Sequence, residues 1–185
     1  MISTLSGGGA EGVCVNLANS FANDDWQVDL VILNLHEEAY LKRLSDKVNL
    51  IVLNVNHARF SILPLLKYIH KNKIKTILVF NYELAVILVI LRLIFRLKIK
   101  IISRNINTLT IKIKQFEKQN LWTRVIVKNL VKYFYNKADH VVNQCDAMRD
   151  DLISYFPELY RNSSTIYNPI PLHILKYTKN HNTNQ

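Results

Sequence analysis

Three consecutive glycines near the amino terminus constrain the fold of this chain more than any other feature. They stand in the stretch Ser6-Gly7-Gly8-Gly9-Ala10-Glu11, between an apolar start at residues 1–5 and a strongly amphipathic segment. In that segment apolar residues recur at the spacing of one helix face: Ala10, Val13, Cys14, Leu17, Ala18 and Phe21. The sequence therefore predicts a strand, a glycine turn and a helix in succession.

This turn has the outline of a phosphate-binding site. Glycines have no Cβ atom and let a ligand approach the backbone, while the first turn of a helix presents unpaired N–H groups with a partial positive charge. A tight strand-to-helix turn that binds nothing accounts for the glycines equally well. The glycines alone leave both interpretations open.

Strand-like and helix-like segments alternate along the rest of the chain. The expected strands after the first are 27–33, 48–53, 76–80, 98–103, 138–143 and 164–171. Helices are expected at 61–72, 81–97, 121–136 and 144–156, with a short helix or turn at 37–45. Such alternation predicts an α/β fold with a parallel sheet and right-handed crossovers. One domain is expected over residues 1–171, followed by a polar tail at 172–185.

Two further segments of the chain are rich in apolar residues. The run from Leu84 to Leu91 is followed by Arg92 and Arg96, and it is too short for a membrane span of about 20 residues. A buried or interfacial helix is expected there. Segment 108–118 alternates apolar and polar residues, which fits either an exposed strand or an interfacial segment.

The net charge of +10 is unevenly distributed. Residues 1–64 contain four Lys or Arg against seven Asp or Glu, whereas residues 65–137 contain sixteen against two. Such a basic surface attracts anionic lipid headgroups, nucleic acid or phosphorylated substrates, and its sign does not choose among them. The alternative is a lysine-rich face that contacts only solvent.

The two cysteines have no metal-ligand spacing around them, and Cys14 is expected in the core.

Several segments, taken in order, resemble the amino-terminal domain of the family 4 glycosyltransferases, which have the GT-B fold and use activated sugar nucleotides with retention. The first is the glycine stretch followed by Val15-Asn16-Leu17-Ala18-Asn19. The others follow in the family's order along the chain: 27–31, 101–105, 138–142, 148–152 and 165–170. The resemblance covers nearly all of residues 5–171 and implies a Rossmann-like domain, one half of a GT-B fold.

The family's second domain carries the donor site, so the resemblance implies that this chain supplies the acceptor side and one wall of the cleft. Gly8, Gly9 and Ala10 would face the diphosphate of the sugar-nucleotide donor, and Arg104 and Asn105 would contact the acceptor or a sugar phosphate. The sugar nucleotide is a co-substrate, and neither a cofactor nor a metal is implied. Residues 172–185 stand at the position of the interdomain linker, so the chain is expected to be incomplete alone. A separate subunit carrying the donor domain would complete it.

The implied function is retaining transfer of a hexose-type sugar to a lipid-linked or polysaccharide acceptor in cell-envelope glycan synthesis. The basic half fits this role, since basic residues are worth roughly 1 kcal/mol each near an anionic membrane. The residues expected to face the membrane are Arg92, Arg96, Lys98, Lys112 and Lys114. The amino terminus lacks the features of a signal peptide. The protein is therefore expected in the cytoplasm, peripheral on the inner face of the membrane.

Other functions remain open at this point. Gly7 to Gly12 satisfies G-x-G-x-x-G, the glycine pattern of NAD(P)-binding Rossmann domains. That pattern needs an acidic residue at the end of the second strand, where Leu33-Asn34-Leu35-His36 stands and Glu37 is the nearest acid. A non-catalytic basic module for membranes or nucleic acid is the other class, but no nucleic-acid-binding motif is found, and nucleic acid is not expected as a partner.

Overall fold

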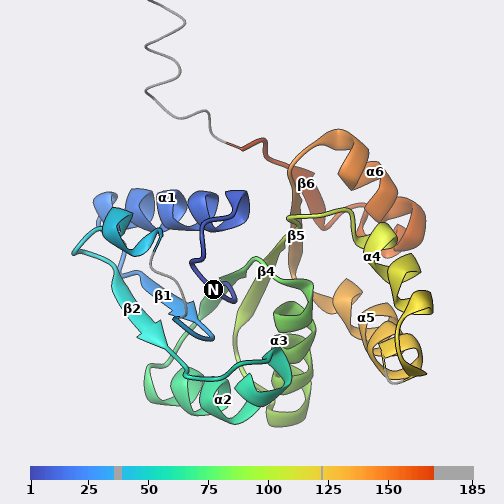
Figure 1. The fold of residues 1–185 in the computed structure, drawn as a ribbon, viewed down its shortest axis with the longest axis horizontal. Helices are drawn as coiled ribbons and strands as arrows, with labels where there is room; N and C mark the ends of the chain where they lie inside the picture. The colour runs from blue at the N-terminus through green and yellow to red at the C-terminus, as the bar shows by residue number, and fades with distance from the viewer. Residues whose placement is uncertain (36–38, 122, 169–185) are drawn as a thin grey trace, which may run out of the picture.

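Six short strands run parallel in the computed structural model, which describes residues 1–35, 39–121 and 123–168 (Figure 1). They are β1 (Asp29–Ile32), β2 (Asn49–Val52), β3 (Thr76–Val79), β4 (Lys100–Arg104), β5 (His140–Asn143) and β6 (Ser163–Thr165). Strand β1 pairs with β2, and β3 to β6 pair in sequence order, with every pair parallel. The α/β fold with a parallel sheet is confirmed.

The amino-terminal segment joins these two groups of strands. Ile2 forms a parallel bridge with Ile32 of β1, and on the other side the Phe80 N–H donates to the Met1 carbonyl at 3.0 Å. The spatial order is therefore β2, β1, the amino-terminal segment, β3, β4, β5, β6. A full strand was expected here, but the segment forms a single bridge at Ile2, and beyond it the Ser3 carbonyl accepts from the Leu33 N–H at 3.0 Å.

Helices connect the strands and cover both faces of the sheet (Figure 1). They are α1 (Gly9–Asn23), α2 (Ile62–Lys71), α3 (Tyr82–Phe95), α4 (Leu109–Gln115), α5 (Lys128–Phe134) and α6 (Asp146–Tyr155). Alternate residues of β1 separate the core into two clusters: Leu30 packs with α1 residues, whereas Val31 packs with α2 and α3. The α1 helix and the α2–α3 pair therefore cover opposite faces of the sheet.

The helices depart from the sequence-based expectation in three places. Segment 108–118 contains α4 and a 3-10 turn at Phe116–Lys118, and α4 forms because Leu109 and Ile113, four residues apart, share one buried face. The helix expected at 121–136 divides into a π-helical turn at Thr123–Val127 and α5. Phe21, expected on the buried face of α1, is 40% exposed. The proposed tail at 172–185 lies outside the described residues.

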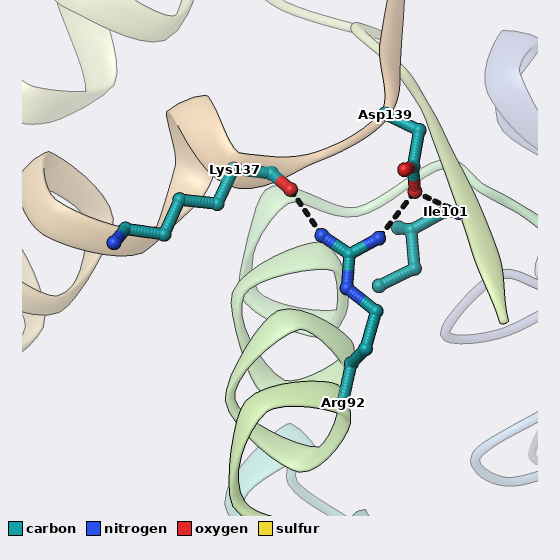
Figure 2. Close-up of polar contacts among 4 residues, drawn as sticks. All are labelled: Arg92, Ile101, Lys137 and Asp139. Atoms are coloured by element: carbon teal, nitrogen blue, oxygen red, sulfur yellow. Dashed lines mark hydrogen bonds and ion pairs between the residues drawn. The ribbon is translucent and has the colours of Figure 1, made fainter. Parts of the chain in front are cut away.

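An ion pair ties α3 to the strands beside it (Figure 2). The Arg92 guanidinium donates to the Asp139 carboxylate and to the Lys137 carbonyl, and the Ile101 N–H donates to the same carboxylate at 2.7 Å. Asp139 thus accepts from a helix and from β4 at once. Arg92 was expected to face a membrane; the structure pairs its guanidinium with Asp139 within the chain, and the membrane contact stays a prediction.

Removing the carboxylate should destabilise the domain. We expect Asp139→Ala to lower the free energy of unfolding by about 1–2 kcal/mol, because it leaves Arg92 and the Ile101 N–H without their shared acceptor. Urea denaturation of the purified chain measures this. Asp150→Ala, at an exposed position on α6, is the control and should change stability by less than about 0.5 kcal/mol. Equal effects of the two substitutions would contradict the role given to Asp139.

Candidate functional site

The carboxyl ends of the parallel strands meet at one edge of the sheet, where α/β folds bind ligands. The glycine loop lies at this edge, at the point where the strand order reverses between the amino-terminal segment and β3. The Ser3 N–H donates to the Asn81 side-chain oxygen at 2.9 Å and joins the two sides of that point. Polar residues that follow β3, β4 and β5 lie along the same edge of the sheet.

Backbone conformation shapes the glycine loop. Gly7 has a φ of 112°, a value that residues with side chains rarely adopt. Gly8 precedes α1 as an extended N-cap residue without a capping side chain. A Cβ atom built on Gly9 would meet nothing within 4 Å, so the space beside Gly9 is open. A ligand can therefore approach the backbone most closely at Gly9.

The first turn of α1 carries free hydrogen-bond donors. The first helical bond runs from the Gly12 N–H to the Gly8 carbonyl at 3.1 Å, so the N–H groups of Gly9, Ala10 and Glu11 have no acceptor within the helix. A Cβ atom on Gly8 would collide with the Glu11 carboxylate, which lies beside this turn. An anion that binds here must displace that carboxylate.

Asn105 belongs to a buried polar network behind the edge. Its side-chain oxygen accepts from the Tyr135 hydroxyl at 2.6 Å, and its amide donates to Asn143 at 2.7 Å. The Tyr135 hydroxyl also lies 2.8 Å from the Ser103 hydroxyl. Asn105 is 6% exposed. It was expected to contact an acceptor, but the structure places it where its side chain holds β4 and β5 in position.

Arg104 is the buried charged residue of the edge. Its guanidinium donates to the Ile166 carbonyl at 3.1 Å and to the Asn168 side-chain oxygen at 2.9 Å, and Arg104 is 4% exposed. Burial lowers the pKa of this guanidinium. Its Nε has no hydrogen-bond partner among the described residues, and neither ion pair found there includes Arg104. The Arg104 Nε–H can therefore donate a hydrogen bond to a bound anion.

Several residues at this edge were not predicted from the sequence. Gln144 donates to the Asn105 carbonyl at 3.1 Å and accepts from Asn168 at 3.1 Å, which links the ends of β4, β5 and β6. Asn81 and Asn143 had also not been singled out. The sequence did contain a signal for them, since polar residues end or directly follow β4 and β5, and Asn81 comes two residues after β3.

A sequence model of Glycosyltransferase Family 4 matches residues 7–173. The chain belongs to glycosyltransferase family 4. Two solved structures share the fold, which confirms the expected half of a GT-B fold. HepE (Alr3699) from Anabaena, in complex with UDP, superposes with a TM-score of 0.61 at 16% identity, over 93% of this chain and 44% of HepE. The apo form of WaaB, a lipopolysaccharide outer core galactosyltransferase, has a TM-score of 0.64 at 12% identity, over 91% of this chain and 46% of WaaB.

This family 4 chain therefore spans less than half the length of either solved structure. No curated protein sequence gives a significant match. The family assignment displaces the NAD(P)-binding alternative, and the structure agrees with it. A dinucleotide site needs a carboxylate at the end of this strand, but β1 is followed by Leu33 and Asn34, and the Asn34 amide donates to Asn56 at 2.6 Å. Glu37 lies outside the described residues.

The basic residues of this family 4 chain have different surroundings. Arg96, Lys98 and Lys114 are exposed, whereas Lys112 lines a cavity of about 180 Å³ with Asn81 and Glu83.

Among the described residues, no helix is long and apolar enough to cross a membrane. No group of three His, Cys, Asp or Glu side chains suited to a metal occurs in that part of the chain either. The expectation of a metal-independent site stays a prediction.

His140, the first residue of β5, should make the stability of the domain depend on pH. His140 Nε2 lies 2.9 Å from the Ser164 hydroxyl, and burial, then the Lys100 charge, lower its pKa. The unfolded chain therefore takes up a proton first as the pH falls below about 6.5, so stability falls from there down to the lowered folded pKa. Thermal unfolding between pH 5 and 8 measures this. His140→Gln should flatten the decline, whereas the exposed control His70→Gln should leave it in place.

Proposed function

We propose that this chain is the acceptor-side half of a retaining glycosyltransferase. It acts with a sugar nucleotide and transfers a hexose-type sugar to a lipid-linked or polysaccharide acceptor in cell-envelope glycan synthesis. The donor domain belongs to the rest of a longer polypeptide or to a separate subunit. The UDP bound to HepE and the galactosyltransferase activity in the name of WaaB support a nucleotide-sugar donor.

The observation that carries this proposal is the open first turn of α1. The free N–H groups of Gly9, Ala10 and Glu11 lie at the reversal point of the sheet, with empty space beside Gly9. Backbone donors of this kind stabilise the charge that develops on a leaving nucleoside diphosphate without a metal. In this proposal Gly8, Gly9 and Ala10 contact the donor diphosphate.

Arg104 is proposed to bind an anionic group of the acceptor or of a sugar phosphate. Its unpartnered Nε and the lack of a carboxylate partner within the described residues support this role. A guanidinium suits phosphate because it donates through a fixed planar fork. Asn105, the next residue along the chain, is held in place by its hydrogen bond with Tyr135.

A thermal-shift panel tests the proposed donor class. We expect UDP-glucose, UDP-galactose or GDP-mannose at millimolar concentration to raise the melting temperature of the purified chain by a few degrees, because ligands that bind only the folded state stabilise it. NADH and NADPH should raise it less. A larger shift with either dinucleotide would contradict the transferase proposal and favour a dinucleotide-binding domain.

The proposed location is the inner face of the membrane, held by exposed basic residues. Vesicles of phosphatidylcholine with one-quarter phosphatidylglycerol should bind the chain at low salt, and pure phosphatidylcholine should not. We expect the double charge reversal Lys98→Glu and Lys114→Glu to weaken binding at least tenfold, at about 1 kcal/mol per lost charge and more on reversal. Lys47→Glu, exposed in the acidic part of the chain, is the control. Equal binding by all variants would contradict the proposal that Lys98 and Lys114 hold the chain at the membrane.

A further inference from the structure

The cavity of about 180 Å³ that Lys112 lines lies at the carboxyl edge of the sheet, between α3 and α4. Asn81 and Glu83 line it from the chain that follows β3, and Asn107 and Lys112 line it from the chain that follows β4. We call this space the edge cavity. Neither the glycine loop nor Arg104 is among the described residues that line it. It is therefore a separate part of the candidate site.

Two opposite charges line the edge cavity without pairing. Neither ion pair found within residues 1–35, 39–121 and 123–168 includes Glu83 or Lys112, although Lys128 and Glu117 do pair elsewhere on the chain, at 2.7 Å. A carboxylate and an ammonium group that line one cavity and stay apart can both contact a molecule bound between them. Both charges therefore keep hydrogen-bonding capacity for a ligand.

Two neighbouring residues add hydrogen-bond donors to the lining. The Asn81 side-chain oxygen accepts from the Ser3 N–H at 2.9 Å, which leaves the Asn81 amide N–H groups for a ligand. Burial and, to a lesser extent, the negative charge of Glu83 raise the pKa of Tyr82, so the Tyr82 hydroxyl keeps its proton. The edge cavity thus offers donors as well as an acceptor.

The remaining lining is apolar, and the volume limits the size of the ligand. Phe80, Ile106 and Leu109 line the cavity, so a ligand that fills it needs an apolar face. A volume of about 180 Å³ corresponds to about six water molecules at ~30 Å³ each, which is the space of one sugar ring with its hydroxyl groups. A nucleotide or a disaccharide needs more space.

Contacts outside the edge cavity fix the helix that carries Lys112. The Thr110 hydroxyl donates to the Asp151 carboxylate of α6 at 2.6 Å, and Leu109 and Ile113 of α4 are buried. Lys112 therefore reaches the cavity from a helix that is held in place before a ligand arrives. Binding to such a site costs little ordering of the chain.

The two charges decide which kind of ligand fits. A phosphate or carboxylate is attracted by Lys112 but repelled by Glu83, and an amine meets the reverse pair of interactions. A hydroxyl group both donates and accepts, so a ring with several hydroxyls satisfies the carboxylate, the ammonium group and the amides together. The C–H face of such a ring suits the apolar wall.

We propose that the edge cavity binds one uncharged sugar ring, and that Glu83 and Lys112 exclude charged rings from it. Glu83 accepts hydrogen bonds from the ring hydroxyls, and Lys112 and Asn81 donate to them. The ring is the terminal sugar of the acceptor, and this last step rests on the proposed function. Binding of the ring and its selectivity do not.

The test is a residue-resolved NMR titration of the isotopically labelled chain at pH 6.5. The uncharged probes are glucose, galactose and N-acetylglucosamine; the charged ones are glucuronate and galacturonate, which are anions, and glucosamine and galactosamine, which are cations. We expect at least one uncharged sugar to shift the amide signals of Glu83, Asn107 and Lys112 with a dissociation constant below 50 mM. The charged sugars of the same configuration should bind at least threefold more weakly.

Changing the charge of one wall should change the selectivity. Lys112→Glu places two carboxylates in the cavity, so we expect the cationic sugar to bind at least tenfold more tightly than it binds the parent chain. Glu83→Gln leaves the ammonium group alone, so the anionic sugar should gain at least threefold. Lys118→Glu, exposed on the 3-10 turn after α4, is the control and should change none of these affinities. Thermal unfolding verifies that each variant is folded.

The proposal is overturned if no uncharged sugar at 100 mM shifts these three signals, or if a charged sugar binds the parent chain as tightly as the uncharged one. A Lys112→Glu variant with the same selectivity as Lys118→Glu would overturn it too. A UDP titration of the same sample, followed at the Gly9 amide, separates this inference from the proposed function. Sugar shifts without a UDP shift would contradict the donor-facing glycine loop and keep the sugar site, and the reverse result would remove the sugar site alone.

Discussion

Gly9→Asp should weaken binding of UDP to the purified chain by at least tenfold. The substitution places a carboxylate beside the free N–H groups of α1, where we propose that the diphosphate binds. Two like charges about 4 Å apart near a protein surface repel by up to about 4 kcal/mol, and solvent and salt reduce this value. Isothermal titration calorimetry or an NMR titration at low salt measures the dissociation constant.

The structure supplies a matched control for this experiment. Gly9→Ala adds only a methyl group into open space, so it should change the affinity less than threefold. An aspartate in the first turn of a helix favours the helix by about 0.3–1 kcal/mol, so Gly9→Asp should fold at least as well as the parent. Unchanged UDP affinity in Gly9→Asp would mean that the nucleotide binds elsewhere or not at all.

Tyr135→Ala should lower the free energy of unfolding by about 3–5 kcal/mol, the largest effect on stability that we expect. Tyr135 is fully buried, its ring lies 6.1 Å from that of Phe156, and its hydroxyl contacts Asn105 and Ser103. The substitution therefore opens a cavity and leaves two buried polar groups without a partner. Chemical denaturation of the purified chain measures the change.

Two further variants separate packing from hydrogen bonding. Tyr135→Phe keeps the ring and removes the hydroxyl, so we expect a loss of about 1–3 kcal/mol. Tyr133→Ala, on α5 two residues earlier and 60% exposed, should cost less than about 1 kcal/mol. A Tyr135→Phe variant as stable as the parent would show that the polar network behind Arg104 contributes little to the fold.

Local patterns were sufficient to predict the order of the elements. The apolar spacing after the glycines predicted α1, and the continuous apolar runs predicted buried parallel strands such as β1, because these signals are carried by neighbouring residues. Segment 108–118 was ambiguous because only seven of its residues form α4. In so short a window, alternating and helical spacings both fit.

The long-range contacts of the fold and of the candidate site could not be predicted in this way. Arg92 and Asp139 are 47 residues apart, and Asn105 and Tyr135 are 30 apart, so no local pattern relates them. Arg92 was expected at a membrane surface because it is charged, and Asn105 was expected to contact an acceptor because it follows a strand. In the structure both side chains form hydrogen bonds within the chain. The roles of Gly8, Gly9, Ala10 and Arg104 stay predictions.

The most direct test of the proposed site is a residue-resolved NMR titration of the isotopically labelled chain with UDP, repeated with GDP and ADP. We expect the amide signals of Gly8, Gly9, Ala10 and Glu11 to shift with at least one of the three, while those of α2, which covers the opposite face of the sheet from α1, stay in place. Shifts confined to other regions, or none with any nucleotide at 10 mM, would contradict a donor-facing site at the start of α1.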